Sequence, residues 1–333
     1  MKKTLSLLLA LVMIFALGAC GQAAAQPTPT PAPTEAPVAT ATPAPETALN
    51  TVILKEADDN MINTYTLLAV NPDAPFTDAD GKAVTGVAIN TAGAEALIDW
   101  MLSPAASALI ADYGQADFGD SLFYLKDGAP VFDGQVAKAT DETKTIRLST
   151  TTSVKDSGLL DYLLPTFESE YGYTVEVQSA GTGKAIAAAQ YGNADLILVH
   201  AKAKETDFVD AGYSYVLPGF ESERLSFMYN YFVLCGPQSD PAGVKDSADV
   251  LAAFAAIAQG EYPFVSRGDG SGTHTKELGI TEDAASFAGY TKWYNSANAG
   301  MGACLVMAEQ LGAYILTDKA TFLTFVANGG VMS

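Results

Sequence analysis

The stretch TIRLSTTTSVKDSGLL, residues 145–160, sets the local pattern of the fold. Residues 145–149 have the side-chain pattern of a strand, and the hydroxyl run 149–153 follows directly. Asp156 or Ser157 is a suitable N-cap for a helix, because the apolar residues beyond them recur at the helical period. The stretch therefore predicts a strand, a polar loop and a helix.

The same alternation continues on both sides of this stretch. Strand patterns occur at 51–54, 66–70, 173–178, 194–199, 231–234 and 263–265. Helix patterns occur at 94–102, from Pro104 onward with Ser103 as N-cap, and at 184–191 and 249–258. This rhythm predicts an α/β fold whose central strands are mostly parallel.

The N-terminus predicts export. Lys2 and Lys3 precede an apolar run at 5–15, which is too short to span a bilayer as a stable helix. Small residues at 17–19 precede Cys20, as in a bacterial lipoprotein. Residues 1–20 are thus expected to be a lipoprotein signal peptide with Cys20 lipidated, and an ordinary secretory signal is the alternative. We expect an extracytoplasmic protein that is anchored to the cell membrane by lipid and does not span it.

Residues 21–50 form a tether. They hold seven of the sixteen prolines, and most of the other residues are Ala and Thr. Such a segment buries no core and favours extended conformers, so at ~3 Å per residue it reaches up to ~90 Å.

Composition excludes several classes of protein. The net charge is −20, and removal of Lys2 and Lys3 with the signal makes it −22, which argues against nucleic-acid binding. The two histidines show no metal-ligand spacing, so we expect no metal site. Cys235 and Cys304 form either a disulfide or two buried thiols. Because no cofactor, nucleophile or general-base motif is visible, we expect a cofactor-free binding protein and not an enzyme.

Three loops are candidates for holding an anion. Each places Gly, Ser or Thr between a strand and a helix start, where free backbone N–H groups and the helix dipole favour negative charge. Arg267 is one of only three arginines and lies inside the third loop, where its guanidinium can bind an oxyanion bidentately. The candidate ligand-binding residues are Thr150, Thr151, Thr152, Ser153, Gly181, Thr182, Gly183, Arg267, Ser271, Gly272 and Thr273.

Three motifs that would indicate a different function are not supported by their residues. Residues 181–184 resemble half of a P-loop, but Gln178 replaces its first glycine and Ala185 its Ser/Thr. His274 lies too close in sequence to its acidic and hydroxyl neighbours to form a strand-tip triad, and no G-x-S-x-G occurs. The Arg-Gly-Asp tripeptide at 267–269 is a common chance match.

From residue 146 onward the chain resembles the TupA family, the tungstate-binding components of ABC transporters. The matching motifs, in the family's order, are 150–153 with 156–160, 181–183, 198–201, 264–269, 271–274 and 300–303. The resemblance implies a two-lobed, type II periplasmic-binding-protein fold with the anion in the cleft. It also implies that tungstate or molybdate is captured and delivered to permease and ATPase subunits, with ligand contacts at 150–153 and at Arg267. We expect a monomer.

The resemblance leaves the ligand open. Gly270 stands where an acidic residue is usual, and Tyr231 replaces a common Asp. The sequence does not separate tungstate from molybdate. A phosphate or sulfate binder with the same fold is one alternative, with Asp269 as an acceptor for a protonated phosphate. A surface sensor or adhesin without transport is another.

The order of the segments resembles a circular permutation of that family. Residues 51–128, through 63–65, 69–72 and 97–104, resemble the family's C-terminal part, and 145–330 resembles its N-terminal and middle parts. Residues 129–144 would connect the old ends, and 51–330 would form one bilobal unit. The expected lobes are 64–128 with 145–231, and 232–330 with 51–58. An error of sequence assembly is the alternative.

Overall fold

The structure is a computed structural model that describes residues 49–284 and 292–331. The predicted signal peptide, Cys20 and nearly all of the tether lie outside these residues.

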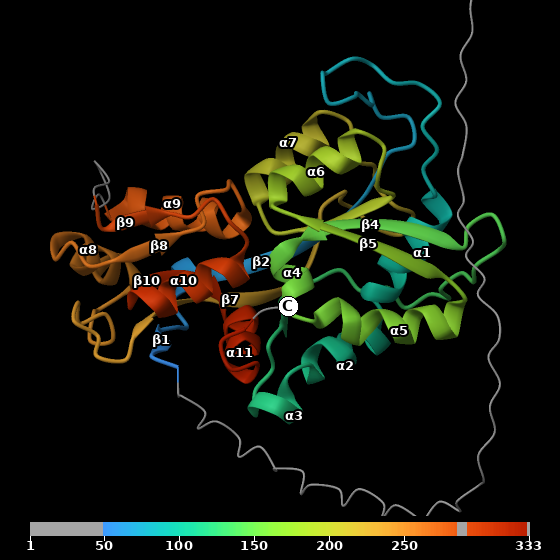
Figure 1. Cartoon of the computed structure of the whole chain (residues 1–333). Helices are drawn as coiled ribbons and strands as arrows, with labels where there is room; N and C mark the ends of the chain where they lie inside the picture. The colour runs from blue at the N-terminus through green and yellow to red at the C-terminus, as the bar shows by residue number, and fades with distance from the viewer. Residues whose placement is uncertain (1–48, 285–291, 332–333) are drawn as a thin grey trace, which may run out of the picture. The chain divides into compact units, whose positions relative to one another are not determined.

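The described residues form an α/β structure (Figure 1). Its strands are β1 (Thr51–Lys55), β2 (Ile62–Ala69), β3 (Tyr124–Leu125), β4 (Thr145–Thr151), β5 (Thr174–Ala180), β6 (Leu196–Val199), β7 (Leu225–Pro237), β8 (Phe264–Ser266), β9 (Tyr294–Ser296) and β10 (Tyr314–Asp318). Its helices are η1 (Asp59–Met61), α1 (Thr91–Met101), α2 (Pro104–Asp112), α3 (Gln115–Phe118), α4 (Thr152–Asp156), α5 (Leu159–Tyr171), α6 (Thr182–Gln190), α7 (Lys202–Asp210), α8 (Val250–Gln259), α9 (Gly272–Ala284), α10 (Met301–Leu311) and α11 (Lys319–Ala327).

Strand β7 belongs to two half-sheets. The strand order is β5-β4-β6-β2-β7-β10-β8-β9, with β1 and β3 also paired to β7. Residues up to Tyr231 pair with β2, whereas Phe232 and those after it pair with β10 and β1. We call the part built on β2 to β6 and the first half of β7 the first lobe. The part built on β1, β8, β9, β10 and the second half of β7 is the second lobe.

The prediction of mostly parallel central strands is wrong for the middle of the sheet. Parallel pairs occur at its two ends, β4 with β5 and β6, and β8 with β9 and β10. Strands β2 and β7 instead pair antiparallel with each other and with their outer neighbours. The strand–helix rhythm that predicted parallel pairing does not extend to these two strands, of which β7 runs from the first lobe into the second.

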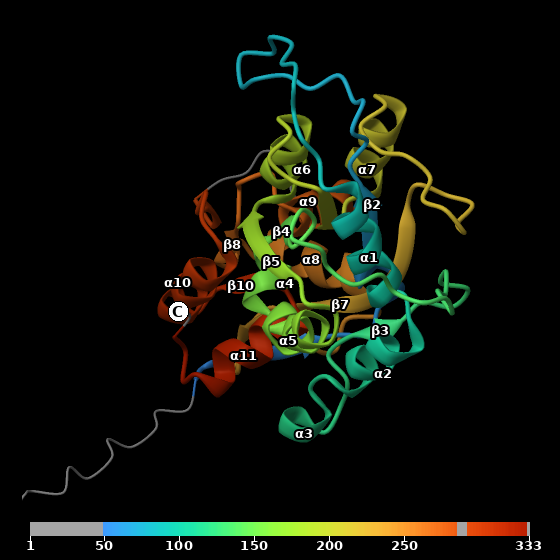
Figure 2. The same cartoon turned by 90° about the vertical axis from the view of Figure 1, so that its right-hand side faces the viewer.

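Each lobe is a sheet with helices on both faces (Figure 2). In the first lobe, α1, α2 and α5 cover one face, and α6 and α7 cover the other. In the second lobe, Phe232 and Leu234 face α8, while Val233 and Cys235 face α10 and α11. This alternation follows from the two-residue period of a strand. It buries both faces of β7 and holds the strand ends in place.

The opening stretch differs in detail from its prediction. The loop expected after residue 149 is the end of β4 followed by the short helix α4. Helix α5 begins after Gly158, and the Ser157 hydroxyl accepts from the Leu159 N–H at 3.4 Å. Gly158 has φ +79°, and a Cβ there would lie 2.7 Å from the hydroxyl of Tyr113. Glycine is therefore required where the chain turns from α4 into α5.

The ends of the described unit lie side by side. A Cβ on Gly330 would be 2.7 Å from the Leu49 side chain, which packs in the cluster of α10 and α11. Residues 129–144, the predicted connector, contain no helix or strand. Cys235 and Cys304 are buried free thiols, so the two do not form a disulfide in this structure.

No single helix in the described part of the chain is long and apolar enough to cross a membrane. Among the residues that the structure describes, one helix pair bent by 60°, Thr91–Met101 with Pro104–Phe118, has the length and composition of a membrane span.

Candidate functional site

The hydroxyl run connects β4 to α4. Thr150 lies within the strand, and its Oγ1 donates to the Leu198 carbonyl at 2.7 Å. Thr151 caps α4 by accepting from the Val154 N–H at 3.4 Å, and its hydroxyl lies 3.1 Å from that of Ser153. Thr152 and Ser153 follow at the start of α4, the part of the run that faces the second lobe.

The second predicted loop lies beside the first. Gly181 begins α6 without a side-chain cap, and Thr182 is fully buried. A Cβ on Gly181 would lie 3.8 Å from the Cα of Ser271, so this loop touches the second lobe. The N–H groups of the first turn of α6 have no partner inside the helix and therefore suit an anion.

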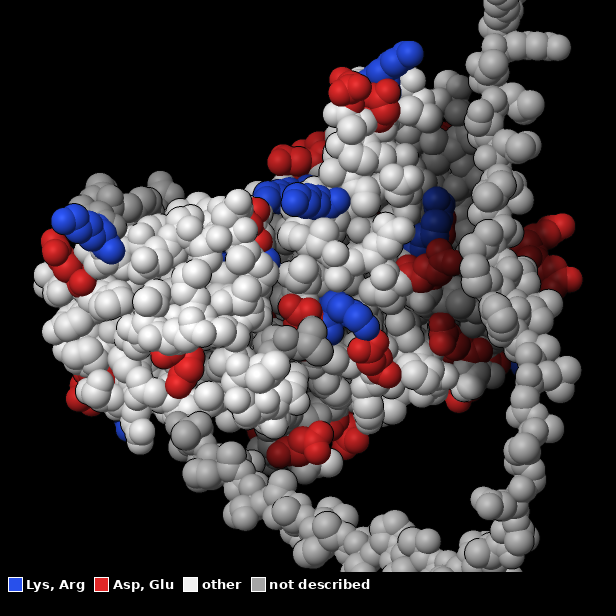
Figure 3. Space-filling view, in the orientation of Figure 1, with Lys and Arg blue, Asp and Glu red and all other residues white. Residues whose placement is uncertain are grey.

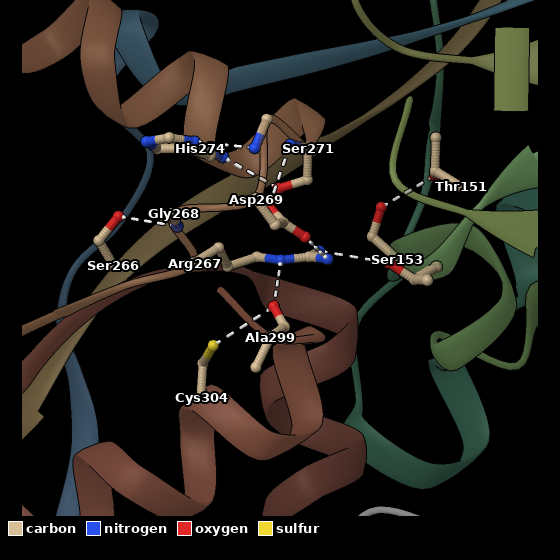
Figure 4. Close-up of polar contacts among 12 residues, drawn as sticks. Thr151, Ser153, Ser266, Arg267, Gly268, Asp269, Ser271, His274, Ala299 and Cys304 are labelled. Atoms are coloured by element: carbon tan, nitrogen blue, oxygen red, sulfur yellow. Dashed lines mark hydrogen bonds and ion pairs between the residues drawn. The ribbon is translucent and has the colours of Figure 1, made fainter. Parts of the chain in front are cut away.

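Arg267 joins the two lobes (Figure 4). Its Nη1 donates to Thr152 Oγ1 at 3.2 Å, its Nη2 pairs with Asp269 at 2.6 Å, and its Nε donates to the Ala299 carbonyl at 3.2 Å. All three arginines pair with a carboxylate, but the side chain of Arg267 is 3% exposed while those of Arg147 and Arg224 are 28% and 23% exposed. Arg267 is thus the buried cation of the interlobe space.

The loop after Arg267 is shaped by a turn and a helix start. Gly268 has φ +62°, and a Cβ there would lie 2.0 Å from Ser296 Oγ, so glycine is required. The Ser271 N–H donates to Asp269 at 3.0 Å, and α9 begins at Gly272. Thr273 is buried in the first turn of α9. The loop thereby directs the N-terminus of a long helix toward the first lobe.

Three buried polar atoms of this region have no hydrogen-bond partner among the described residues: Thr182 Oγ1, Thr273 Oγ1 and His200 Nδ1. Buried polar groups are normally satisfied, so each such atom calls for an explanation. These three come from different elements, α6, α9 and the residue after β6. An oxyanion in the interlobe space would offer acceptors to the two hydroxyls.

The charges of Arg267 and Asp269 offset each other. Burial alone would raise the pKa of Asp269, but the Ser271 hydrogen bonds and the Arg267 cation hold it below its usual value. Asp269 is therefore ionised and offsets Arg267. Burial raises the pKa of Asp156 in spite of the nearby Arg267 and Lys155 cations. An incoming anion thus meets neutral donors and a guanidinium already paired with a carboxylate, while acidic side chains are spread over the face in Figure 3.

Two residues were not predicted as part of the site. His200 follows β6, its Nε2 lies 3.1 Å from Ser153 Oγ, and its ring touches Gly272. Lys204 in α7 donates to the Gly270 carbonyl at 3.0 Å, a bond from the first lobe to the second. A sequence signal existed for His200, because the ends of parallel strands meet at one edge of a sheet and β6 is parallel to β4.

A cleft of about 800 Å³ adjoins the site and shares His200 and Gly272 with it. Its walls come from both lobes, with Thr64 and Ser226 on one side and Thr275 and Ile280 of α9 on the other. The interlobe space therefore extends beyond His200. Among the described residues, no group of three or more His, Cys, Asp or Glu side chains is placed to hold a metal ion.

Comparison with known families places the chain in a superfamily of binding proteins. Residues 136–333 match the model of the PBP superfamily domain. The matched part excludes β1, β2, β3 and helices α1 to α3, which the structure packs into both lobes.

Individual relatives are similar over part of their length. The chain is 43% identical over 202 residues to the tungstate-binding protein TupA of Peptoclostridium acidaminophilum, covering 60% of this chain and 67% of that one. It is 46% identical over 181 residues to a Haloferax volcanii protein named for anion binding in an ABC transporter, covering 54% of this chain and 51% of the relative, so it spans about half of that protein's length. The crystal structure of the tungstate ABC transporter from Geobacter sulfurreducens matches with 39% identity and a TM-score of 0.49, over 55% of this chain and 75% of that one.

Proposed function

The chain belongs to the TupA family of the PBP superfamily, and on this basis we propose that it is the solute-binding component of an ABC transporter for tungstate or molybdate. It would capture the oxyanion between its lobes and deliver it to permease and ATPase subunits. In this role it is a binding protein and carries out no reaction.

One observation carries this proposal: the buried Arg267 guanidinium reaches across the lobes to Thr152, at the meeting point of three loops rich in hydroxyl and backbone donors. A tetrahedral dianion without protons needs only donors. Thr152, Ser153, Thr182 and Thr273 supply hydroxyls, and α6 and α9 supply helix N-termini. The predicted ligand residues that lie deeper stabilise the loops instead: Thr150, for example, donates to the Leu198 carbonyl.

The donors are sufficient in energy. Nanomolar binding requires ~12 kcal/mol. Six to eight hydrogen bonds to a dianion, at roughly 1.5–3 kcal/mol each, contribute about 10–20 kcal/mol before the cost of association. Because these donors act at contact range, the acidic exterior, screened beyond ~8 Å, does not prevent binding.

Calorimetric titration of residues 49–333 with tungstate, molybdate, sulfate and phosphate tests the proposal. We expect one-to-one binding of tungstate or molybdate and weaker binding of sulfate and phosphate. Tight phosphate binding would instead assign Asp269 as the acceptor for a protonated ligand. Binding of none of the four would refute the proposed function and favour a sensor or adhesin.

We further propose that Cys20 carries the lipid and that residues 21–50 tether the binding unit outside the cell membrane. The small residues before Cys20 and the proline-rich segment after it support this arrangement. Metabolic labelling with a fatty acid, comparing the full chain with Cys20→Ala, tests it. Label on the variant, or none on the full chain, would refute lipidation at Cys20.

The circular permutation remains a proposal, and two features of the fold support it. Without β2, the region that matches the superfamily model would leave a gap between β6 and β7, since β2 pairs with both. The contact between Leu49 and Gly330 means that a short link there would restore the family's usual order. A chain linked between 330 and 49 and opened within 129–144 should fold and bind tungstate with unchanged affinity. Failure of that chain to fold would count against the permutation.

A further inference from the structure

The cleft of about 800 Å³ beside the site is positively charged. Four cationic and two acidic side chains line it, which gives a net charge of +2, whereas the whole chain carries −20. The charged residues that line three other hollows of the surface give net charges of zero, −1 and zero. The positive charge is therefore a property of this cleft and not of hollows in general. Its charged residues are Lys126, Lys202, Arg224 and Lys276, with Asp59 and Glu205.

Three of these cations have no carboxylate to balance them. Arg224 pairs with Glu205. In contrast, no ion pair of Lys126, Lys202 or Lys276 is found among the residues that the structure describes. Unbalanced cations in a cleft concentrate the electric field there and attract anions from solution. The lining of the cleft therefore suits a ligand of negative charge.

Lys276 in α9 is the most enclosed of the three lysines. It is partly buried, whereas the other two are exposed. Its ammonium donates to the Asn60 carbonyl at 3.1 Å and lies 6.0 Å from the centre of the Phe232 ring. Burial lowers the pKa of Lys276, because the charged form has lost part of its water without gaining a counter-ion. An anion in the cleft would supply that counter-ion.

The cleft and the anion site meet at His200. This residue lines the cleft, and its Nε2 lies 3.1 Å from the Ser153 hydroxyl of the site. Its ring centroid lies 6.4 Å from that of Phe232, the ring beside the Lys276 ammonium. Burial, together with the Arg267 and Lys276 cations, lowers the pKa of His200 to about 3, so the ring is neutral and stands in the field of both cations. One interlobe space thus holds two cations, Lys276 in the cleft and Arg267 in the site, on either side of a neutral ring.

We propose that this cleft is a second, weaker binding position for small dianions, from which the oxyanion enters the site at Arg267. The entry route rests on the proposed function of that site. Ammonium groups are hydrated point charges without a fixed fork geometry, so they hold tetrahedral dianions with little selectivity. Selection then belongs to the hydroxyls and the guanidinium of the inner site. A cleft of positive charge also raises the association rate of an anion that must approach an acidic protein.

Lysine acetylation, read by mass spectrometry, tests occupancy of the cleft. At constant ionic strength, millimolar tungstate or sulfate should slow the acetylation of Lys276 at least about threefold. Lys245 is the internal control, because it is an exposed lysine of the same lobe and lines none of the four hollows, so its rate should not change. Equal slowing of both lysines, or no slowing of Lys276 by either anion, would overturn the inference.

Arg267→Ala separates the cleft from the inner site. Protection of Lys276 by sulfate or tungstate should persist in this variant, because the cleft uses other cations. Protection that disappears with Arg267 would assign the effect to the inner site and overturn the inference. Acetylation can be followed even if wild type binds no tungstate at Arg267, so failure of the proposed function is distinguishable from failure of the cleft.

Stopped-flow kinetics test the entry route. Lys276→Met keeps the aliphatic stem and removes the charge, so the association rate constant of tungstate should fall about fivefold at low salt, while the dissociation rate changes less than about twofold. Lys276→Arg should stay within about twofold of wild type, because it keeps the charge. Lys245→Met removes the same charge outside the cleft and should leave association nearly unchanged.

Three kinetic results would contradict the entry route: an unchanged association rate in Lys276→Met, an equal fall in Lys245→Met, or a change confined to dissociation. If Lys276→Met does not fold, Lys126→Met replaces it, since this side chain is exposed and lines the cleft from the first lobe. We expect its association rate constant to fall about twofold at low salt. No fall in that variant would overturn the inference.

Discussion

The two lobes contribute to the site in different ways. The first lobe offers Thr152, Ser153 and Thr182, which are neutral hydroxyls held by strand ends and helix starts. The second lobe offers the buried Arg267, paired with the partly exposed Asp269, beside the N-terminus of α9. Neutral donors act only at hydrogen-bond distance, so they distinguish ligands by shape and protonation. The guanidinium acts over a longer range and links the lobes, so we expect it to dominate the affinity.

The largest expected effect is that of Arg267→Ala. It removes the cation, the bond to Thr152 and the partner of Asp269, so the tungstate Kd should rise at least tenfold and the remaining carboxylate should repel the anion. Titration calorimetry at fixed salt measures the change, and thermal unfolding checks the fold. Arg267→Lys, which keeps the charge but loses the two-pronged geometry, should lie between Ala and wild type. An unchanged affinity in Arg267→Ala would remove this residue from the site and end the distinction between the lobes.

The contribution of the first lobe, whose donors are neutral hydroxyls, is tested by substituting two of its threonines. Thr182→Val removes a hydroxyl with no partner among the described residues, so stability should hold while the tungstate Kd rises about fivefold. Thr150→Val removes the bond to the Leu198 carbonyl, so it should lower stability by ~1 kcal/mol and change the affinity less. Chemical denaturation and titration of both variants separate ligand-facing hydroxyls from supporting ones. The reverse pattern would show that Thr150 and not Thr182 faces the anion.

Much of this arrangement was predictable from local patterns. Strand ends followed by Gly, Ser and Thr gave the three loops, and the scarcity of arginine drew attention to Arg267. The antiparallel course of β2 and β7 was not predictable, because strand direction depends on pairing between distant residues. Lys204 was missed for the same reason, whereas His200 follows a strand that pairs parallel to β4 and could have been placed at the same edge. Their neighbours, Gly270 and Ser153, lie 66 and 47 positions away.

A smaller effect is expected at the contact between the lobes. The Lys204 ammonium donates to the Gly270 carbonyl and would lie 3.6 Å from a Cβ on Gly183, so it links the lobes beside the α6 loop. Lys204→Met should raise the dissociation rate of tungstate about two- to threefold, as expected for one exposed bond. Stopped-flow measurements give the rate. Lys202→Met is the matched control, since it removes the same charge from the same helix at a residue that lines the neighbouring cleft. Equal effects of both variants would indicate a general charge effect and no link between the lobes.

The smallest effect on binding, with a clear effect on stability, is expected for Glu277 in α9, the helix that follows the Arg267 loop. Burial raises the pKa of Glu277 to about 7, although Tyr294 donates to its carboxylate at 2.5 Å. A carboxyl whose folded pKa is raised stabilises the protein fully below its unfolded pKa, near 4.5, and loses that contribution as the pH rises through about 7. Glu277→Gln mimics the protonated form, so it should leave stability unchanged at pH 4 and raise it at pH 8 by up to about 3 kcal/mol.

Glu309 is the matched control of opposite sign. Burial alone would raise its pKa, but hydrogen bonds from Thr51 and Asn50 lower it, so Glu309→Gln should cost stability at pH 8. Denaturation of both variants at the two pH values measures this. Loss of stability in Glu277→Gln at pH 8 would mean that its ionised form is paired, and that the second lobe holds a further charge beside Arg267 and Asp269.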